Sequence, residues 1–211
     1  VVVTGSFQNF DTTFMRDALA QFGPTFVGVA QIPADTPDAE IIALDAIGVR
    51  GVRFNLVRGG SAGIEDLDQV ARRVHDLAGW HVELYADAKD LAPVFDSVSR
   101  LPAISIAHLG LSTEGLPTLL RLVEHGMMVK ATGFGRIDMD VATAIRALTA
   151  ANPDCLMFGS DLPSQRARRP FEPHDMDLIR ANIDPAIERK VFFDNAVRFY
   201  HPREIARGKE T

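Results

Sequence analysis

Asp161 is the first residue whose type and position could do chemistry. It lies in the run LMFGSDLP (residues 156–163), in which four apolar or small residues predict a buried strand that stops at Ser160. A carboxylate almost never stays fully buried unless it is paired, and catalytic acids and bases often lie where a strand ends. Asp shortly before a proline such as Pro163 is also ordinary turn chemistry. The local pattern alone therefore leaves a catalytic residue and a turn former as alternatives.

His108 holds the same kind of position, after the apolar run ISIA and before Leu109 and Gly110. A lone histidine beside apolar residues is usually structural, but the end of a strand favours a functional role for an imidazole. Of the other histidines, His174, in the loop after the last predicted strand, could reach the same end. The rest fall within a helix, at the opposite end of the strands or in the tail: His75, His81, His125 and His201.

Three arginines, Arg53, Arg58 and Arg136, fall at the ends of predicted strands or in the loops that follow. Guanidinium groups match carboxylates in a two-pronged geometry, so these positions predict a small anionic substrate. Each arginine could instead be solvated or paired with a neighbouring acidic residue. The stretch RGGSAGIED, which precedes a predicted helix, could also hold an anion on its backbone N–H groups.

Short apolar, β-branched runs alternate with amphipathic segments along the 211 residues. The predicted strands are residues 1–4, 26–30, 52–56, 82–85, 103–107, 127–131 and 156–159. The predicted helices are residues 13–22, 38–47, 64–77, 116–124 and 141–151. Strands that alternate with helices, and that are apolar enough to be covered on both faces, predict a parallel sheet.

The number of βα units then selects the fold. An open, doubly wound sheet would usually show a glycine-rich phosphate turn after its first strand, and TGSFQNFD is no such turn. The alternative is an eight-stranded (β/α)8 TIM barrel of about 250 residues. This chain is about one unit short of that and begins in mid-strand at Val1. We therefore expect residues 1–211 to form a single βα-barrel domain of strands 2 to 8, with the first βα unit absent from this sequence.

In a βα barrel the chemistry lies at the carboxyl ends of the strands. The predicted strands have a dense polar set at or just after those ends: Ser6, Gln31, Arg53, Asn55, Arg58, Tyr85, Asp87, His108, Lys130, Arg136, Ser160 and Asp161. The amino ends offer Gly51, His81 and Cys155. This asymmetry predicts an active site at one end of the barrel.

Composition narrows the partners. The chain is 46% hydrophobic and 24% charged, which is typical of a soluble globular protein. Its formal net charge of −6 and its scattered Lys and Arg residues argue against nucleic acid, and no apolar stretch is long enough to span a bilayer. The single cysteine, Cys155, excludes an intrachain disulfide and a cysteine-cluster zinc site, and it fits a reducing, cytoplasmic compartment. A homo-oligomer is left open.

Six segments together carry a resemblance to a known family. They are GVRGVRFNLV, WHVELYADAKDL, ISIAHLG, MVKATGFGRID, MFGSDLP and VFFDNAVRFY, and they run through nearly the whole chain. In this order they resemble the amidohydrolase-related family of βα-barrel hydrolases, and within it the 2-pyrone-4,6-dicarboxylate lactonase-like branch. The resemblance implies a distorted barrel that hydrolyses esters, lactones or amides, with some members that decarboxylate instead.

The resemblance also assigns roles. Asp161 matches the last-strand Asp of the family, the general base that activates water, and His108 matches a histidine that polarises the carbonyl group. Arg53, Arg136, Tyr85 and Ser6 are then expected to hold substrate carboxylates, with Arg58 as a further substrate-binding residue. The second arginine of the family motif would fall on Gly59, one position beyond Arg58.

Two departures bear on metal use. The His-x-His pair of the family lies on the first strand, which this sequence lacks, and metal-using relatives have a histidine where this chain has Tyr85. A zinc site needs about three protein ligands, and only His108 and Asp161 are in place here. The leading expectation is a hydrolase without a cofactor. The alternatives are an amidohydrolase or decarboxylase with one divalent metal such as zinc, bound in part by His108 and Asp161, and a non-catalytic anion-binding barrel.

Overall fold

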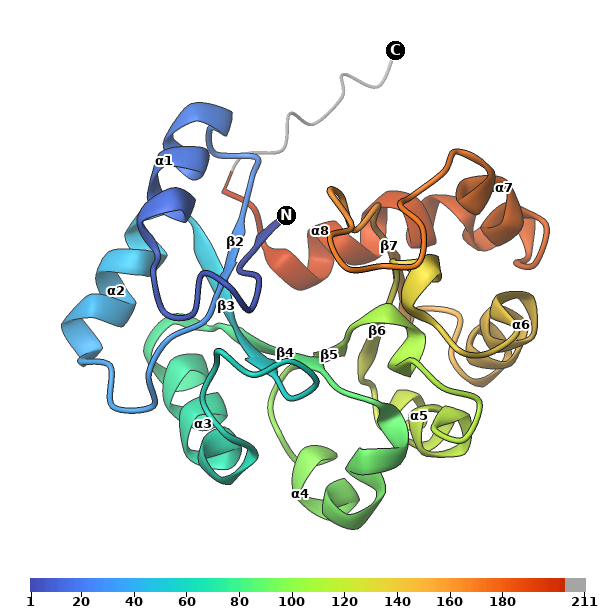
Figure 1. Cartoon of the computed structure of the whole chain (residues 1–211), viewed down its shortest axis with the longest axis horizontal. Helices are drawn as coiled ribbons and strands as arrows, with labels where there is room; N and C mark the ends of the chain where they lie inside the picture. The colour runs from blue at the N-terminus through green and yellow to red at the C-terminus, as the bar shows by residue number, and fades with distance from the viewer. Residues whose placement is uncertain (204–211) are drawn as a thin grey trace. The chain divides into compact units, whose positions relative to one another are not determined.

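The computed structural model describes residues 1–203, in which strands and helices alternate (Figure 1). The strands are β1 (Val2–Val3), β2 (Gly28–Ala30), β3 (Val49–Asn55), β4 (His81–Tyr85), β5 (Ile104–Ile106), β6 (Met128–Ala131) and β7 (Leu156–Phe158). The α-helices are α1 (Thr13–Phe22), α2 (Asp38–Ile47), α3 (Leu67–Ala78), α4 (Phe95–Val98), α5 (Leu116–Glu124), α6 (Val141–Ala151), α7 (His174–Arg180) and α8 (Asn195–Tyr200).

The seven strands follow chain order in one sheet. The pairs β1–β2, β2–β3, β5–β6 and β6–β7 are parallel. This confirms an α/β fold with a parallel sheet, and each of the seven predicted strands is present. The expectation that one further βα unit precedes β1 stays a prediction.

The helix predictions match closely because the apolar spacing and the stop signals agree. Helices α1, α2, α5 and α6 begin and end at the predicted residues. The helix predicted at residues 64–77 begins as a 3-10 turn, Ile64–Asp66, and continues as α3. The sequence analysis missed the 3-10 segment Ala88–Val94 with the short α4, and it missed α7. Pro93 and the lengths of four and seven residues leave too little periodicity in these segments to detect.

The described residues form two compact units, residues 1–82 with 200–203, and residues 83–199. We refer to them as unit 1 and unit 2. In unit 1 the core is built from α1 to α3 and β1 to β3, with Met15, Ile41, Phe54 and Trp80 buried. Helix α2 packs against α3. The expectation of a single domain stays a prediction.

Unit 2 has a separate apolar core under its strands. Ile104 and Ile106 of β5 are buried, as are Leu119 of α5 and Leu148 of α6. The thiol of Cys155 is also buried in this core, where burial raises the pKa of the thiol to about 12. A buried thiol with a raised pKa is an inert packing group.

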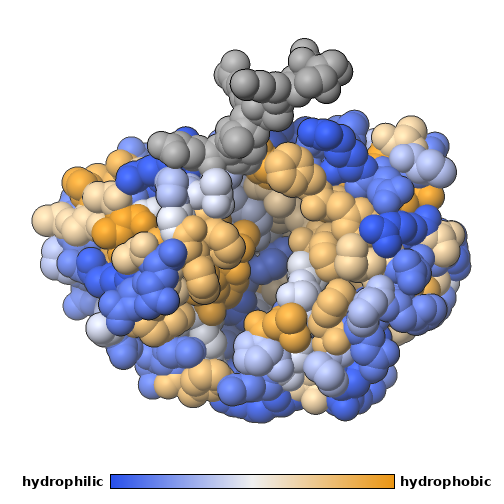
Figure 2. Space-filling view, turned by 90° about the horizontal axis from the view of Figure 1, so that it is seen from above, coloured by the Kyte–Doolittle hydropathy of each residue, from blue (hydrophilic) through white to orange (hydrophobic). Residues whose placement is uncertain are grey.

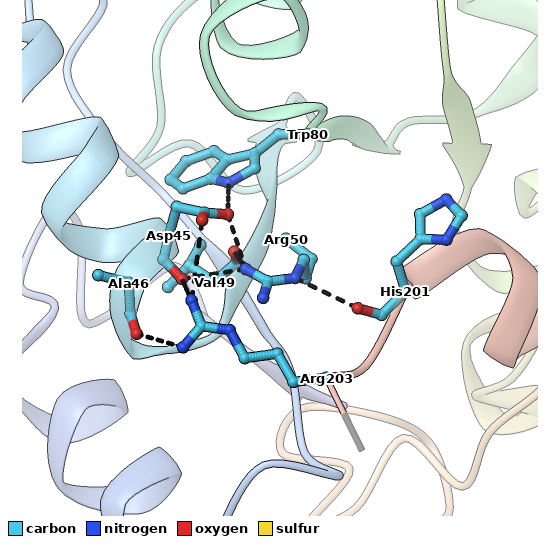
Figure 3. Close-up of polar contacts among 7 residues, drawn as sticks. All are labelled: Asp45, Ala46, Val49, Arg50, Trp80, His201 and Arg203. Carbon is cyan, nitrogen blue, oxygen red and sulfur yellow. Dashed lines mark hydrogen bonds and ion pairs between the residues drawn. The ribbon is translucent and has the colours of Figure 1, made fainter. Parts of the chain in front are cut away.

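Unit 1 also contains a cluster around the last turn of α2 (Figure 3). The carboxylate of Asp45 accepts hydrogen bonds from Arg50 Nη1 at 2.7 Å and from Trp80 Nε1 at 3.2 Å. Arg203 donates to the backbone carbonyls of Asp45 and Ala46 at 2.9 and 2.7 Å. Two guanidinium groups therefore satisfy carbonyl groups at the C-terminal end of this helix, where cations are favourable.

The surface has a mixed hydropathy. Figure 2 shows hydrophilic and apolar side chains intermixed on one face. None of the helices in residues 1–203 combines the length and the apolar composition that a membrane crossing requires.

Candidate active site

The predicted site residues are divided between the two units. Unit 2 contains Tyr85, His108, Arg136 and Asp161, whereas unit 1 contains Ser6, Arg53 and Arg58.

His108 follows β5 and is buried, with 4% of its surface exposed. Its Nδ1 atom lies 2.8 Å from Oγ1 of Thr132, the residue after β6. The ring of Tyr85, at the end of β4, meets the imidazole edge-on with 4.9 Å between the centroids. These contacts fix the plane of the imidazole and leave Nε2 as the nitrogen closest to Asp161.

Asp161 lies three residues after the end of β7, and its two carboxylate oxygens have different neighbours. Oδ2 accepts a hydrogen bond from Nε of Arg136 at 2.7 Å. Oδ1 lies 3.9 Å from Nε2 of His108, which is too far for a direct hydrogen bond. The structure therefore brings Asp161, His108 and Arg136 together in unit 2, with one carboxylate oxygen held and the other open towards the imidazole.

The backbone is unusual at both His108 and Asp161. Their φ angles are +53° and +58°, in the left-handed region that residues other than glycine rarely occupy. Such conformations cost free energy and tend to persist at functional sites, where the surrounding structure enforces them. The two residues that resemblance and strand position favour for chemistry thus share a strained backbone.

Gly133 makes the close approach of these side chains possible. A Cβ atom at this position would lie 2.6 Å from Nδ1 of His108 and 2.9 Å from Oδ2 of Asp161. Its φ of +60° also favours glycine. Any larger residue at position 133 would push the imidazole or the carboxylate out of place.

In unit 1 a side-chain amide joins the two loops that contain Ser6 and Arg58. Nε2 of the buried Gln31 donates to the carbonyls of Asn9 and Gly60 at 2.9 and 2.6 Å, which joins the loop after β1 to the loop after β3. Ser6, half-buried, lies in the first loop, and the exposed Arg58 lies in the second. Arg53 is a buried residue of β3.

Two residues of the predicted polar set have structural roles. Lys130 pairs with the fully buried Glu83, with 2.7 Å between Nζ and Oε2. Asp87 accepts from the backbone N–H of Lys89 and from Oγ of Ser112, so it caps a 3-10 segment. Position at a strand end was therefore not enough to distinguish Lys130 and Asp87, which have structural roles, from the residues that lie beside Asp161.

The histidines other than His108 lie elsewhere. Nδ1 of His75 is 3.3 Å from the carbonyl of Trp80, and Nδ1 of His125 is 2.8 Å from that of Arg121. His81 is the first residue of β4, and His174, exposed, begins α7.

Comparison with known proteins identifies the family. The family Amidohydro_2, described as amidohydrolase, matches residues 1–201. The chain belongs to this amidohydrolase family. The protein is therefore an enzyme of the hydrolase class.

One curated relative and two solved structures are similar to this amidohydrolase. It is 28% identical to a 2-pyrone-4,6-dicarboxylate hydrolase of Comamonas testosteroni, over 97% of this chain and 76% of the relative. A protein of Agrobacterium tumefaciens shares its fold with a TM-score of 0.83 at 20% identity, over 96% and 80% of the two chains. A structure described as a probable 2-pyrone-4,6-dicarboxylic acid hydrolase of Acinetobacter baumannii, with citric acid bound, has a TM-score of 0.77 at 22% identity, over 94% and 82%. The chain is thus similar to the branch that the sequence motifs indicated.

Many amidohydrolases bind a divalent metal, and two side chains of this site are of a type that could ligate one. Nε2 of His108 and Oδ1 of Asp161 are the two candidates, and Oδ2 of Asp161 is already held by a guanidinium group. Within residues 1–203, no three His, Cys, Asp or Glu side chains are grouped so that they could hold a metal ion. A zinc site takes about three protein ligands. The described residues do not form a complete metal site.

The sequence analysis missed two residues of this site in the amidohydrolase. Thr132 and Gly133 are uncharged and follow β6 directly, in the motif MVKATGFGRID. Their position after a strand was the available signal, but neither residue type indicates chemistry by itself.

Proposed function

We propose that this amidohydrolase hydrolyses a small lactone or ester that carries carboxylate groups, similar to 2-pyrone-4,6-dicarboxylate, with water activated by Asp161. The observation that carries the proposal is the asymmetry of the Asp161 carboxylate, which is held by Arg136 on one oxygen and open on the other. The relative from Comamonas testosteroni supports the substrate class. So does the neighbour from Acinetobacter baumannii, which was solved with a polycarboxylate.

Asp161 and His108 are spaced for a reacting group between them. A water molecule ~2.8 Å from both Oδ1 of Asp161 and Nε2 of His108 would see the two atoms, 3.9 Å apart, at an angle of roughly 90°. A carboxylate that is held in place by Arg136 can take a proton from this water while the water oxygen bonds to the carbonyl carbon of the substrate. General-base catalysis by a positioned carboxylate is typically worth about 10²–10⁴-fold in rate.

His108 would act on the other side of the reacting group. Once the substrate is bound, the single N–H at Nε2 donates to the carbonyl oxygen in place of the water and stabilises the negative charge that forms there. When the tetrahedral intermediate collapses, the bond from carbon to the leaving oxygen breaks, and the proton held by Asp161 passes to that oxygen. The products are an alcohol or enol and a carboxylic acid, which ionises by releasing its proton to solvent, and the side chains return to their starting state.

The substrate carboxylates need cationic or hydroxyl partners. In unit 2 these are Tyr85 and the terminal nitrogens of Arg136, of which Nη2 also donates to the carbonyl of Gln165 at 3.0 Å. Arg53, Arg58 and Ser6 of unit 1 are proposed as further partners because of their strand-end positions and the family resemblance. Charge-assisted hydrogen bonds of this kind are each worth about 1.5–3 kcal/mol.

Hydrolysis assays with matched substrates test the proposal. The full-length protein is given 2-pyrone-4,6-dicarboxylate and, as the control, its neutral dimethyl ester, and acid release is followed in a pH-stat. We expect kcat/KM for the dicarboxylate to exceed that for the ester by at least about 10-fold, since at least one charged contact is lost in the ester. Equal values for the two substrates would contradict the proposed specificity.

Metal removal separates this mechanism from the metal-dependent alternative. We expect turnover of the dicarboxylate to survive exhaustive chelation, with the metal content of the protein measured in parallel. If activity disappears and returns only with a divalent metal, the reaction depends on that metal. Release of CO2 from the same substrate would instead indicate a decarboxylase.

A further inference from the structure

Thr132 has no role in the reaction as described so far, yet its hydroxyl group lies within hydrogen-bond distance of His108. The residue is buried, with 4% of its surface exposed. Its Oγ1 atom lies 2.8 Å from Nδ1 of His108, on the side of the ring away from Nε2. This distance is that of a well-formed hydrogen bond.

The direction of the Thr132 side chain is fixed by its other branch. A Cβ atom at Gly159 would lie 2.8 Å from Cγ2 of Thr132, so the methyl group of Thr132 packs directly against the backbone of that glycine. A β-branched side chain has few χ1 rotamers. With the methyl group against Gly159, the hydroxyl group is directed at the imidazole.

The number of hydrogens on each group then determines whether Thr132 Oγ1 or His108 Nδ1 is the donor. A hydroxyl group can donate one hydrogen bond, and a neutral imidazole carries its hydrogen on one nitrogen and accepts on the other. Among residues 1–203, His108 Nδ1 is the partner of Thr132 Oγ1. If Nδ1 carried the hydrogen, the buried hydroxyl hydrogen would have no acceptor, which is costly. If the hydroxyl donates to Nδ1, both groups are satisfied.

We propose that Thr132 is a positioning residue that donates its hydroxyl hydrogen to Nδ1 of His108 and thereby holds the hydrogen of the neutral imidazole on Nε2. The proposal rests on the proposed function, because it concerns the same reaction. It assigns the chemistry of the site: His108 is a hydrogen-bond donor to the substrate, and Asp161 is left as the base. In this tautomer Nε2 has no free electron pair for a metal, and ligation there would require the hydrogen bond with Thr132 to be reversed.

Nitrogen NMR of the imidazole rings tests the tautomer directly. The full-length protein is labelled with 15N-histidine, and the signals of His108 among the six histidines are assigned by their absence from His108→Gln. Above the pH at which the ring loses its charge, we expect the Nε2 signal of a protonated nitrogen and the Nδ1 signal of an unprotonated one. The reverse pattern in the native protein would overturn the proposal whatever the enzyme hydrolyses.

Three variants separate positioning from packing. Thr132→Val keeps the shape but removes the hydroxyl group, Thr132→Ser keeps the hydroxyl group, and Thr118→Val makes the first change at another buried threonine of unit 2. We expect Thr132→Val to lose the tautomer preference and about 10-fold in kcat, the worth of one hydrogen bond, with little change in KM. Thr132→Ser should keep the Nε2–H tautomer and most of kcat, and Thr118→Val should match the native protein in both.

The outcomes of the two measurements are distinguishable. A native tautomer pattern in Thr132→Val would overturn the role of Thr132, as would equal rate losses in Thr132→Val and Thr132→Ser. If the native protein shows the expected tautomer but turns over no carboxylated lactone or ester, the proposed function fails while the assignment of the hydrogen bond is supported.

Discussion

Two aspartates of this amidohydrolase pair with arginine, and their surroundings differ in one respect. Asp45 in α2 has cationic or N–H partners on both carboxylate oxygens: Arg50 and Trp80 on Oδ1, and Arg203, 3.9 Å away, on Oδ2 (Figure 3). Asp161 has Arg136 on one oxygen, while the other faces His108 without a hydrogen bond to it. In both cases one oxygen accepts a hydrogen bond and the other lies 3.9 Å from a nitrogen atom, which belongs to an arginine at Asp45 and to a histidine at Asp161. A guanidinium group is always charged, whereas an imidazole can be neutral.

Asp45 and Asp161 also differ in backbone conformation and in the charged groups around them. Asp45 lies in a regular helix, whereas Asp161 has a φ of +58°. In the Asp45 cluster, burial lowers the pKa of Arg50 from its ordinary value, the carboxylate of Asp45 opposes this shift, and the charge of Arg203 adds to it. An aspartate whose two oxygens both face guanidinium groups holds structure together, and one with an oxygen beside a histidine, in a strained position, can act on another molecule. The predictions below contrast these two cases.

Asp161→Asn has the largest expected effect. The amide keeps the shape of the side chain but cannot accept the proton of water, so kcat should fall by about 10²–10⁴-fold. The free energy of unfolding, measured with urea, should change little. Turnover comparable to that of the native protein would remove Asp161 from the mechanism.

Arg136→Met tests whether Nε of Arg136 positions Asp161 while its terminal nitrogens bind the substrate. Loss of the hydrogen bond from Nε should misplace Asp161 and lower kcat by about 10-fold for neutral and carboxylated substrates alike. Carboxylated substrates should lose a further ~10-fold in kcat/KM if the terminal nitrogens bind them. An unchanged rate with neutral esters would show that Arg136 does not position the base.

Asp45→Asn should show the opposite pattern to Asp161→Asn. Two guanidinium groups would lose their carboxylate, and Arg50 is largely buried, with 12% of its side chain exposed. We expect the free energy of unfolding to fall by about 1–2 kcal/mol, as for a partly exposed hydrogen bond to a charged group. The kcat of the folded enzyme should be unchanged. A loss of kcat with native stability would contradict the structural role of this cluster.

Arg203→Met has the smallest expected effect. This side chain is about half exposed, and its ion pair with Asp45 spans 3.9 Å. Exposed pairs contribute about 0–1 kcal/mol, and the lost bonds to the carbonyls of α2 add little because water can replace Arg203 there. Urea unfolding of this variant beside Asp45→Asn would show which arginine carries the cluster. A larger loss for Arg203→Met would reverse the assignment.

The sequence predicted the elements well and the site in part. The order and type of the seven strands follow from apolar runs, and the ends of α1, α2, α5 and α6 follow from periodicity with glycine and proline stops. His108 and Asp161 could be found because their residue types indicate chemistry at a strand end. These signals are local, and each depends on a few consecutive residues.

Side-chain contacts between different strands could not be predicted from these local signals. Lys130 and Thr132 flank one residue of the same motif, yet the first pairs with a buried glutamate and the second with His108. A strand-end position predicts where a residue lies, but the partner that it meets depends on side chains of other strands. The pairing of Arg136 with Asp161 was missed for the same reason, since 25 residues separate them.

Gln31 has a consequence for engineering this scaffold. Its amide nitrogen donates hydrogen bonds to the carbonyls of Asn9 and Gly60, and these bonds set the distance between the two loops. A graft or deletion that shifts either carbonyl would leave the buried amide of Gln31 without one of its acceptors. The two loops therefore cannot be exchanged one at a time. Libraries that vary both loops together, with Gln31 kept or replaced in step, should yield more folded variants than libraries that vary one loop alone.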